Sequence, residues 1–273
     1  MIDRLPIDGS QIGDEPMALG RTAEVFSGPD GSVVKLLLQG RSEADARDEA
    51  ARTAAAHAAG APAPEVHGLV NIDGRHGIVM AQVDADSLVD VAALEPLRLT
   101  SYAKVFADVH HQILSHESDD LPPIGDELRR KIRAADVPAA TRNAALDVVA
   151  AAPDGSAVLH GDYHPGNVLM APDGPIAIDW VNASRGPASA DVANTLLLLS
   201  TATIGEGTPN RRMVGALQGA FRRSYTKRIR RAGRVHPKVL DAWRLPMAAA
   251  RLAEGVASEE AALRSQLERW TGI

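Results

Sequence analysis

The chain has 273 residues, of which 45% are hydrophobic, and a formal net charge of −6. This length allows one large domain or two lobes that share a cleft. The absence of cysteine excludes disulfides, thiolate nucleophiles and cysteine-held metal centres. An acidic chain lacks an overall basic field, which argues against nucleic acid as its partner. No signal peptide and no apolar run long enough for a membrane are visible, so we expect a cytoplasmic protein.

The first third of the chain predicts a small sheet with one helix. Short apolar runs predict strands at Ala23–Gly28, Ser32–Leu38, Val66–Val70 and His76–Val83. Ser42 is a favourable N-cap for a helix that runs to about Ala59, where Gly60 ends it.

Helical periodicity dominates after Val83. We expect helices at Leu97–His116, Ile124–Ala135 and Pro138–Ala152, a strand–loop–strand unit at Ala157–Met170, a short strand at Ile176–Asp179, and helices from Ala188 to the end. The predicted fold class is therefore α+β. A small β-rich lobe covers residues 1–80, a connector covers 81–86, and a larger, mostly helical lobe covers 87–273. A cleft between two such lobes is a natural ligand site.

Polar residues gather in one rigid loop, His160–Asn167, between two apolar segments. Asp179 follows nearby, at the end of a predicted buried strand. A buried carboxylate costs desolvation energy unless a cation compensates it. Asp179 and Asn167 offer oxygen ligands that suit Mg²⁺, with nucleotide phosphates completing the coordination.

The run His160-Gly161-Asp162, with Asn167 and then Asp179, resembles the catalytic core of the aminoglycoside phosphotransferase and choline kinase family. The spacing also matches the protein-kinase catalytic loop. Gly161 stands where protein kinases carry arginine, as in the small-molecule branch. The resemblance implies a bilobal protein-kinase-like fold. It also implies transfer of the γ-phosphate of ATP or GTP, with Mg²⁺, to a hydroxyl group of a small molecule.

The resemblance assigns the catalytic loop its roles. Asp162 accepts the hydroxyl proton of the acceptor. Asn167 and Asp179 hold Mg²⁺. His160 supports the loop by hydrogen bonds, and Asp191 caps a helix and braces the same loop.

The resemblance extends to the nucleotide-binding parts of the first lobe. Gly20, Arg21 and Thr22 lie in the place of the nucleotide-covering loop, which has a single glycine here. The backbone at Ala81, Gln82 and Val83 would bind the purine edge.

Lys35 takes the place of the phosphate-binding lysine on a strand. A half-buried lysine needs a counter-charge. Glu49 on the following helix is the candidate partner, and Glu43 and Asp45 are possible substitutes.

Two other interpretations of the polar loop have less support. His160, Asp162 and His164 alternate in a way that suits a zinc hydrolase, but no second cluster supplies a further ligand. A pseudokinase would bind nucleotide without turnover, yet no charged catalytic residue is missing. The pair His110-His111, followed by His116, is interpreted as packing or surface.

The acceptor is the least defined part. Cationic aminoglycosides need acidic walls, for which Glu254, Glu259 and Glu260 are candidates on the last helices. Choline needs an aromatic cage, and aromatic residues make up only 3% of the chain. An antibiotic or similar hydroxylated metabolite is the first expectation, with choline, homoserine or a sugar as alternatives. The oligomeric state is left open.

A basic stretch runs from Arg211 to Lys238 without an acidic residue. It is compatible with a solvated helix face, a nucleic-acid patch, or a site for an anionic part of the substrate. The sequence does not separate these three.

Overall fold

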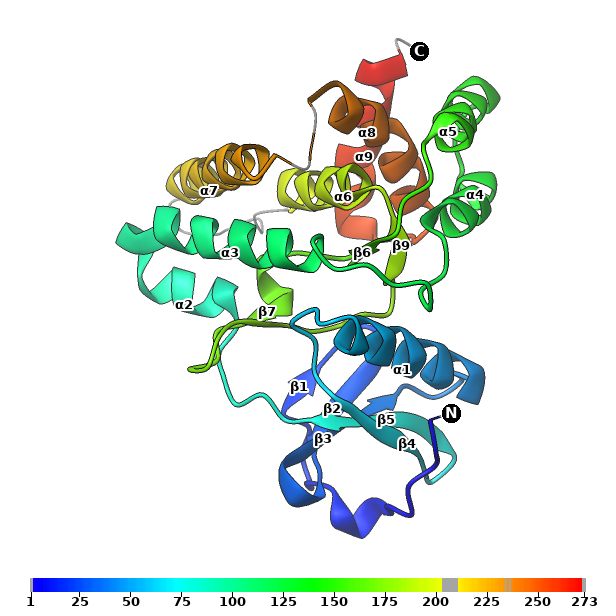
Figure 1. Cartoon of the computed structure of the whole chain (residues 1–273), viewed down its shortest axis with the longest axis vertical. Helices are drawn as coiled ribbons and strands as arrows, with labels where there is room; N and C mark the ends of the chain where they lie inside the picture. Colours follow the sequence, from blue (N-terminus) through cyan, green and yellow to red (C-terminus); the bar gives the residue numbers. More distant parts are fainter. Residues whose placement is uncertain (1, 203–210, 234, 236, 272–273) are drawn as a thin grey trace.

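A five-stranded sheet with one helix is followed in the chain by a larger helical part, as a computed structural model shows (Figure 1). The structure describes residues 2–202, 211–233, 235 and 237–271. From the basic stretch, Arg234 and the side chains of Arg211 and Lys238 lie outside the described part. The α+β arrangement of a β-rich first lobe and a helical second lobe is confirmed.

The sheet of the first lobe is antiparallel, in the order β1-β2-β3-β5-β4. Its strands are β1 (Ala18–Leu19), β2 (Ala23–Ser27), β3 (Ser32–Leu37), β4 (Val66–Ile72) and β5 (Arg75–Ala81). Helix α1 (Glu43–Ala58) covers one face, where Ala46 and Ala50 pack against Leu37 and Ile78. The N-terminal segment covers the other face through Leu5, Ile7 and Ile12.

The start of α1 is fixed by a capping box. The Asp45 N–H donates to Ser42 Oγ at 3.2 Å, and the Ser42 N–H donates to Asp45 Oδ2 at 2.8 Å. This start sets the rotational phase of the helix. Glu49, one turn further on, is therefore turned toward the sheet and is buried.

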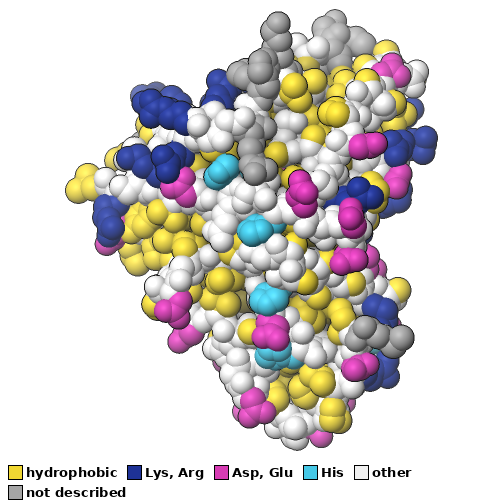
Figure 2. All heavy atoms as spheres, viewed as in Figure 1, with side chains coloured by type: hydrophobic (Ala, Val, Ile, Leu, Met, Phe, Trp, Pro, Cys, Tyr) yellow, Lys and Arg dark blue, Asp and Glu magenta, His cyan; other side chains and the backbone are white. Residues whose placement is uncertain are grey.

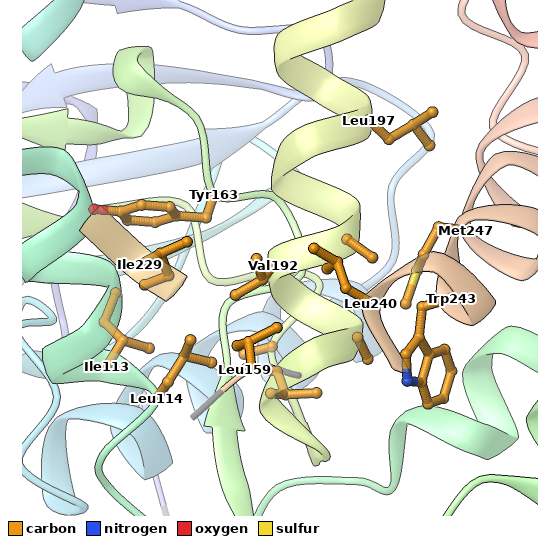
Figure 3. Packing of buried hydrophobic residues seen from close by; sticks show 14 of the residues in the cluster. Ile113, Leu114, Leu159, Tyr163, Val192, Leu197, Ile229, Leu240, Trp243 and Met247 are labelled. Carbon is orange, nitrogen blue, oxygen red and sulfur yellow. The ribbon is translucent and has the colours of Figure 1, made fainter. Parts of the chain in front are cut away.

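The second lobe is built around α6. Its helices are α2 (Leu88–Leu94), α3 (Leu99–Ile113), α4 (Ile124–Ala134), α5 (Ala139–Ala151), α6 (Ala188–Thr201), α7 (Arg211–Arg231), α8 (Pro237–Leu252) and α9 (Ala257–Thr271). Figure 3 shows Val192 and Leu197 of α6 lying among buried side chains of neighbouring elements, such as Leu159, Ile229 and Leu240. This packing holds α6 beneath the polar loop.

Two short ribbons frame that loop. The first pairs β6 (Ala157–Leu159) with β9 (Ser184–Gly186), and the second pairs β7 (Val168–Leu169) with β8 (Ile176–Ala177). The polar residues between β6 and β7 are thus anchored at both ends.

The structure corrects several expected elements. Helix α2 and strand β9 were not predicted, and the predicted helix Leu97–His116 is a 3₁₀ turn at Pro96–Arg98 followed by α3. The strand predicted at Ile176–Asp179 ends at Ala177, because Asp179 has a φ of 67° and leaves the extended conformation. The placing of the connector at 81–86 stays a prediction. None of the described helices is long and apolar enough to cross a membrane.

Candidate active site

Lys35 joins the two lobes by ion pairs. Its Nζ lies 2.5 Å from Glu49 Oε1 on α1 and 2.9 Å from Asp179 Oδ1 beyond β8. Of the three candidate carboxylates on α1, Glu49 is thus the one that contacts Lys35. Glu43 binds two arginines instead, and Asp45 is used in the capping box. Residues 144 positions apart in the chain meet at this point.

The environment of Lys35 keeps it charged. Burial lowers the pKa of Lys35, but Asp179 and Glu49 outweigh that effect, so its pKa is raised. Burial raises the pKa of Glu49, and Lys35 opposes this only in part. Burial also acts to raise the pKa of Asp179, but Lys35 reverses the direction and the pKa of Asp179 is lowered. Asp179 therefore stays a carboxylate at neutral pH.

Gly161 gives the polar loop its shape. Its φ is 79°, a conformation that L side chains rarely adopt. A Cβ at this position would lie 2.3 Å from the carbonyl oxygen of Asn182. The amide of Asn194 on α6 donates to Gly161 O at 2.7 Å. Both backbone conformation and close packing therefore require glycine directly before Asp162.

Asp191 braces the loop from the first turn of α6. Its carboxylate accepts hydrogen bonds from the backbone N–H groups of His160 at 2.7 Å and of Gly161 at 2.9 Å. The predicted capping role is wrong, because the N-cap of α6 is Pro187, which makes no side-chain bond. The Asp191 side chain reaches back to the loop instead of binding its own helix end.

A buried chain of polar groups continues from Asp191. His110 Nε2 on α3 lies 3.2 Å from Asp191 Oδ2, and His110 Nδ1 lies 2.7 Å from Tyr225 Oη on α7. Burial acts to raise the pKa of Asp191, but hydrogen bonding and charge from His110 lower it. Sequence reasoning assigned His110 to packing or surface and missed this role.

His160 supports the loop with both ring nitrogens. The Asp162 N–H donates to His160 Nδ1 at 3.3 Å, so Nε2 carries the hydrogen and donates to Ile178 O at 3.0 Å. Burial lowers the pKa of His160. A ring engaged in this way has no nitrogen left for a metal. No group of three or more His, Cys, Asp or Glu residues in the described part of the chain could hold a metal ion.

Asn167 and Asp179 lie on adjacent segments. The Ile178 N–H donates to Asn167 O at 2.9 Å, and the Asn167 amide nitrogen donates to Asp162 O at 3.0 Å. This leaves Asn167 Oδ1 and Asp179 Oδ2 without a hydrogen bond from the residues that the structure describes. Two hard oxygen donors beside the Lys35 ammonium fit a Mg²⁺ site.

The predicted nucleotide-covering segment is the turn between β1 and β2. The Gly20 N–H donates to Ala23 O at 2.8 Å, so Gly20, Arg21 and Thr22 form the tip of a hairpin. Arg21 is exposed there. The structure places this hairpin next to β3, which carries Lys35.

The backbone N–H groups at the end of β5 differ in whether they are free to bind a ligand. The Ala81 N–H donates to Glu65 O at 2.9 Å, and the Gln82 N–H donates to Gly31 O at 3.0 Å, both within the first lobe. The N–H of Val83 has no acceptor among the described residues. Of the three positions named for the purine edge, only Val83 has a free donor.

Arg251 was not anticipated from the sequence. This α8 side chain places Nη1 3.5 Å from Asp162 Oδ1, an oxygen that is buried and accepts no hydrogen bond from the described residues. Burial acts to lower the pKa of Arg251, but Glu259, Glu254 and Asp162 raise it. A permanent positive charge therefore lies beside the candidate base.

The acidic residues expected to bind the acceptor are engaged within the chain. Glu259 binds Arg251 with both oxygens at 2.8 Å, and Glu254 contacts Arg251 at 2.6 Å and Lys131 at 2.9 Å. Glu260 pairs with an arginine on the surface. The structure does not bring Glu260 to Asp162. The acceptor role of these three residues stays a prediction.

Comparison with known proteins identifies the family. The model of the phosphotransferase enzyme family (APH) matches residues 25–232, most of the chain. The chain belongs to this family. No protein of curated function matches this phosphotransferase-family chain.

Solved structures confirm the protein-kinase-like fold of this family member. A thermostable mutant of aminoglycoside phosphotransferase APH(4)-Ia is 18% identical, with a TM-score of 0.65 over 95% of this chain and 94% of that chain. The amicoumacin kinase hAmiN is 12% identical, with a TM-score of 0.61 over 99% and 91%. A choline/ethanolamine kinase family protein from Mesorhizobium loti is 13% identical, with a TM-score of 0.56 over 93% and 86%.

Proposed function

We propose that this member of the phosphotransferase family transfers the γ-phosphate of ATP or GTP to a hydroxyl group of a small molecule. The contact of Lys35 with both Glu49 and Asp179 carries the proposal. It brings a phosphate-binding cation, its buried counter-charge and a metal-binding carboxylate to one point beside the catalytic loop.

Each residue of the site has a distinct task in this proposal. Lys35, oriented by Glu49, binds the α- and β-phosphates. The Val83 N–H and the turn at 20–22 bind the base and cover the phosphates. Asn167 and Asp179 hold Mg²⁺, which neutralises charge on the phosphate oxygens when bound.

Asp162 acts on the acceptor. Its carboxylate accepts the hydrogen of the acceptor hydroxyl, and the acceptor oxygen forms a bond to the γ-phosphorus. The bond from that phosphorus to the β–γ bridging oxygen breaks as the nucleoside diphosphate leaves. Phosphoryl transfer of this kind depends on positioning and charge more than on covalent chemistry by the protein.

The acceptor class proposed here is a hydroxylated antibiotic or a similar metabolite. The APH(4)-Ia mutant structure is a ternary complex with AMP-PNP and hygromycin B, and the hAmiN structure contains AMP-PNP, Ca²⁺ and Ami. These complexes support a nucleotide, a divalent cation and a small hydroxylated acceptor. A choline, homoserine or sugar acceptor stays the alternative.

The test is a phosphorylation assay with the full chain, Mg²⁺ and either ATP or GTP. A panel of hydroxylated antibiotics, sugars and amino alcohols is screened by mass spectrometry for a product heavier by one phosphoryl group. We expect one class of acceptor to be phosphorylated by the protein and not by its Asp162→Asn variant.

Two negative results have different meanings. Binding of nucleotide without any product over the panel would favour a pseudokinase or an untested acceptor class. Failure to bind either nucleotide with Mg²⁺ would contradict the proposed function itself.

A further inference from the structure

A cavity of about 960 Å³ lies between α6, α7, α8 and α9. Its described lining includes seven cationic side chains and no acidic one. The cations are Arg222, Arg223, Lys227, Arg230, Arg231, Arg244 and Arg269. Lys and Arg side chains gather over α7 on the surface (Figure 2). Five of the ten cations of the basic stretch thus line this cavity.

Most of these exposed cations have no partner among the described residues. Arg244 lies 2.9 Å from Asp241, but the other six have no ion pair or side-chain hydrogen bond with any residue that the structure describes. On the same helix α7, Arg228 faces away from the cavity lining and binds Asp108 at 2.7 and 3.1 Å. Paired and unpaired cations thus lie on one helix, and what distinguishes them is the face of the helix that they occupy.

The spacing on α7 makes this arrangement costly. Arg223, Lys227 and Arg231 follow one another at intervals of four residues on one face, and like charges at this spacing destabilise a helix. No ion pair or side-chain hydrogen bond from the described residues reaches these three cations, and only Arg231 lies in the last turn, where the helix dipole favours a cation. A bound anion would offset the repulsion among them and would be attracted by the same field.

The remaining lining narrows the chemistry of that anion. Leu196, Leu197 and Leu240 form an apolar part of the wall, and Trp270 adds an aromatic ring. Arginine side chains bind phosphate with two parallel hydrogen bonds. The volume is that of a small-molecule pocket. Trp270 is the single aromatic residue of the described lining, whereas single-stranded nucleic acid requires several stacking side chains.

We propose that this cavity binds a small molecule that carries several phosphate groups. The site is separate from the candidate active site, because the described lining contains none of the residues that contact Lys35 or Asp162. The proposal does not depend on the proposed phosphotransfer.

The first experiment measures binding of inositol hexakisphosphate to the full chain by isothermal titration calorimetry, at low and high salt. The triple variant Lys227→Gln/Arg230→Gln/Arg231→Gln should lose at least about tenfold in affinity and show a weaker salt dependence. Arg230→Gln alone should also lower the affinity, and Arg228→Gln, which removes one cation from the same helix but outside the cavity, is its matched control. We expect a change of less than about twofold in the control.

Competing ligands decide the chemical class. Citrate tests carboxylates, and a short single-stranded oligodeoxythymidylate tests nucleic acid. Tighter binding of either than of inositol hexakisphosphate would overturn the proposal, as would unchanged affinity in the triple variant or no binding to the unmodified chain. Lys35→Met should keep the affinity, which separates this site from the candidate active site.

Trp270 provides a readout of location. It is 38% exposed, whereas Trp180 and Trp243 are 0% and 2% exposed, so a ligand in the cavity changes the emission of Trp270. Trp270→Phe should abolish the fluorescence change and retain binding in calorimetry. A fluorescence change that persists in Trp270→Phe would place the ligand elsewhere and overturn the proposal.

Discussion

Helices α6 and α8 each take part in two regions that differ in electrostatic character. At one end, Asp191 of α6 binds the catalytic loop and Arg251 of α8 contacts Asp162. Elsewhere along the same two helices, Leu197 and Arg244 line the basic cavity. In the first region, buried charges meet opposite charges or hydrogen-bond donors. In the second, cations meet other cations.

The difference shows how each region obtains its balance of charge. Around Asp162 and Lys35, the chain supplies both signs, so the geometry is set before any ligand binds. Such preorganisation is what electrostatic catalysis needs. In the cavity the described lining carries only cations, so a balancing charge comes from outside that lining, as Asp241 shows for Arg244. Predictions about the two regions therefore differ in direction as well as size.

The largest effect is expected at Asp162. Asp162→Asn removes the base and keeps the shape of the side chain, so turnover should fall by about 10²- to 10⁴-fold. Nucleotide affinity should change little, because Lys35 and the metal ligands are intact. Single-turnover kinetics and calorimetry with a nucleotide measure the two quantities. Unchanged turnover on a verified acceptor would remove Asp162 from the mechanism.

Lys35→Met should also lower turnover by about 10²-fold or more, because charge on the phosphates loses its fixed counter-charge. In contrast to Asp162→Asn, it should weaken Mg²⁺–nucleotide binding and destabilise the fold, since Glu49 stays buried without its cation. Lys104→Met, at an exposed position of α3, is the matched control. Equal nucleotide affinity in both variants would contradict the assignment of Lys35.

Arg251 is expected to position Asp162 without binding nucleotide. Arg251→Gln should lower kcat about tenfold and leave nucleotide affinity unchanged, and Arg251→Lys should recover part of the loss. The free energy of unfolding should also fall, since Glu254 and Glu259 lose a shared partner. A purely structural role would affect stability in both variants without a separate effect on kcat.

The Asp191 network predicts a pH dependence of stability. Its folded-state pKa is lowered relative to the unfolded chain, so its contribution is complete above the unfolded pKa of about 3.9 and is lost as pH falls through the folded-state pKa. Denaturant unfolding between neutral and acid pH measures this. Asp191→Asn should remove that part of the acid dependence, and Asp126→Asn, on the surface of α4, should not.

The smallest effect on stability is expected for a cavity residue, and its sign should be opposite to that of Arg251→Gln. Arg230→Gln without added polyanion should leave the free energy of unfolding within about 0.5 kcal/mol or raise it, because repulsion among like charges decreases. Arg251→Gln is the contrasting variant from the other region. A clear loss of stability in Arg230→Gln would mean that the cavity cations have stabilising partners within the chain.

The candidate residues were named from the resemblance of short segments to a family. Asp162 and Asn167 lie on one loop, and Lys35 and Glu49 lie on a strand and the helix that follows it, so each pair could be named from neighbouring parts of the chain. The kinase-like fold was predicted on the same residues. The α1 capping box also explains why Glu49, and not Glu43, meets Lys35.

Contacts between distant segments were beyond such reasoning. His110 and Asp191 are 81 residues apart, and no spacing links Arg251 to Asp162. Helix α2 has only seven residues, too few for periodicity to reveal, although Ser87 and Asp90 form its cap. These features depend on tertiary packing, which single-sequence patterns do not encode.

The contact between Lys35 and Asp179 bears on the order in which substrates bind. Asp179 Oδ1 already accepts the Lys35 ammonium at 2.9 Å, so a divalent ion arriving alone competes with a fixed positive charge for this carboxylate. If the proposed function holds, nucleotide phosphates would offer Lys35 another anionic partner and would release Asp179. The cation would then bind best as part of the nucleotide complex. The salt bridge between Lys35 and Asp179 would thus favour binding of the divalent cation and the nucleotide together over binding of one after the other.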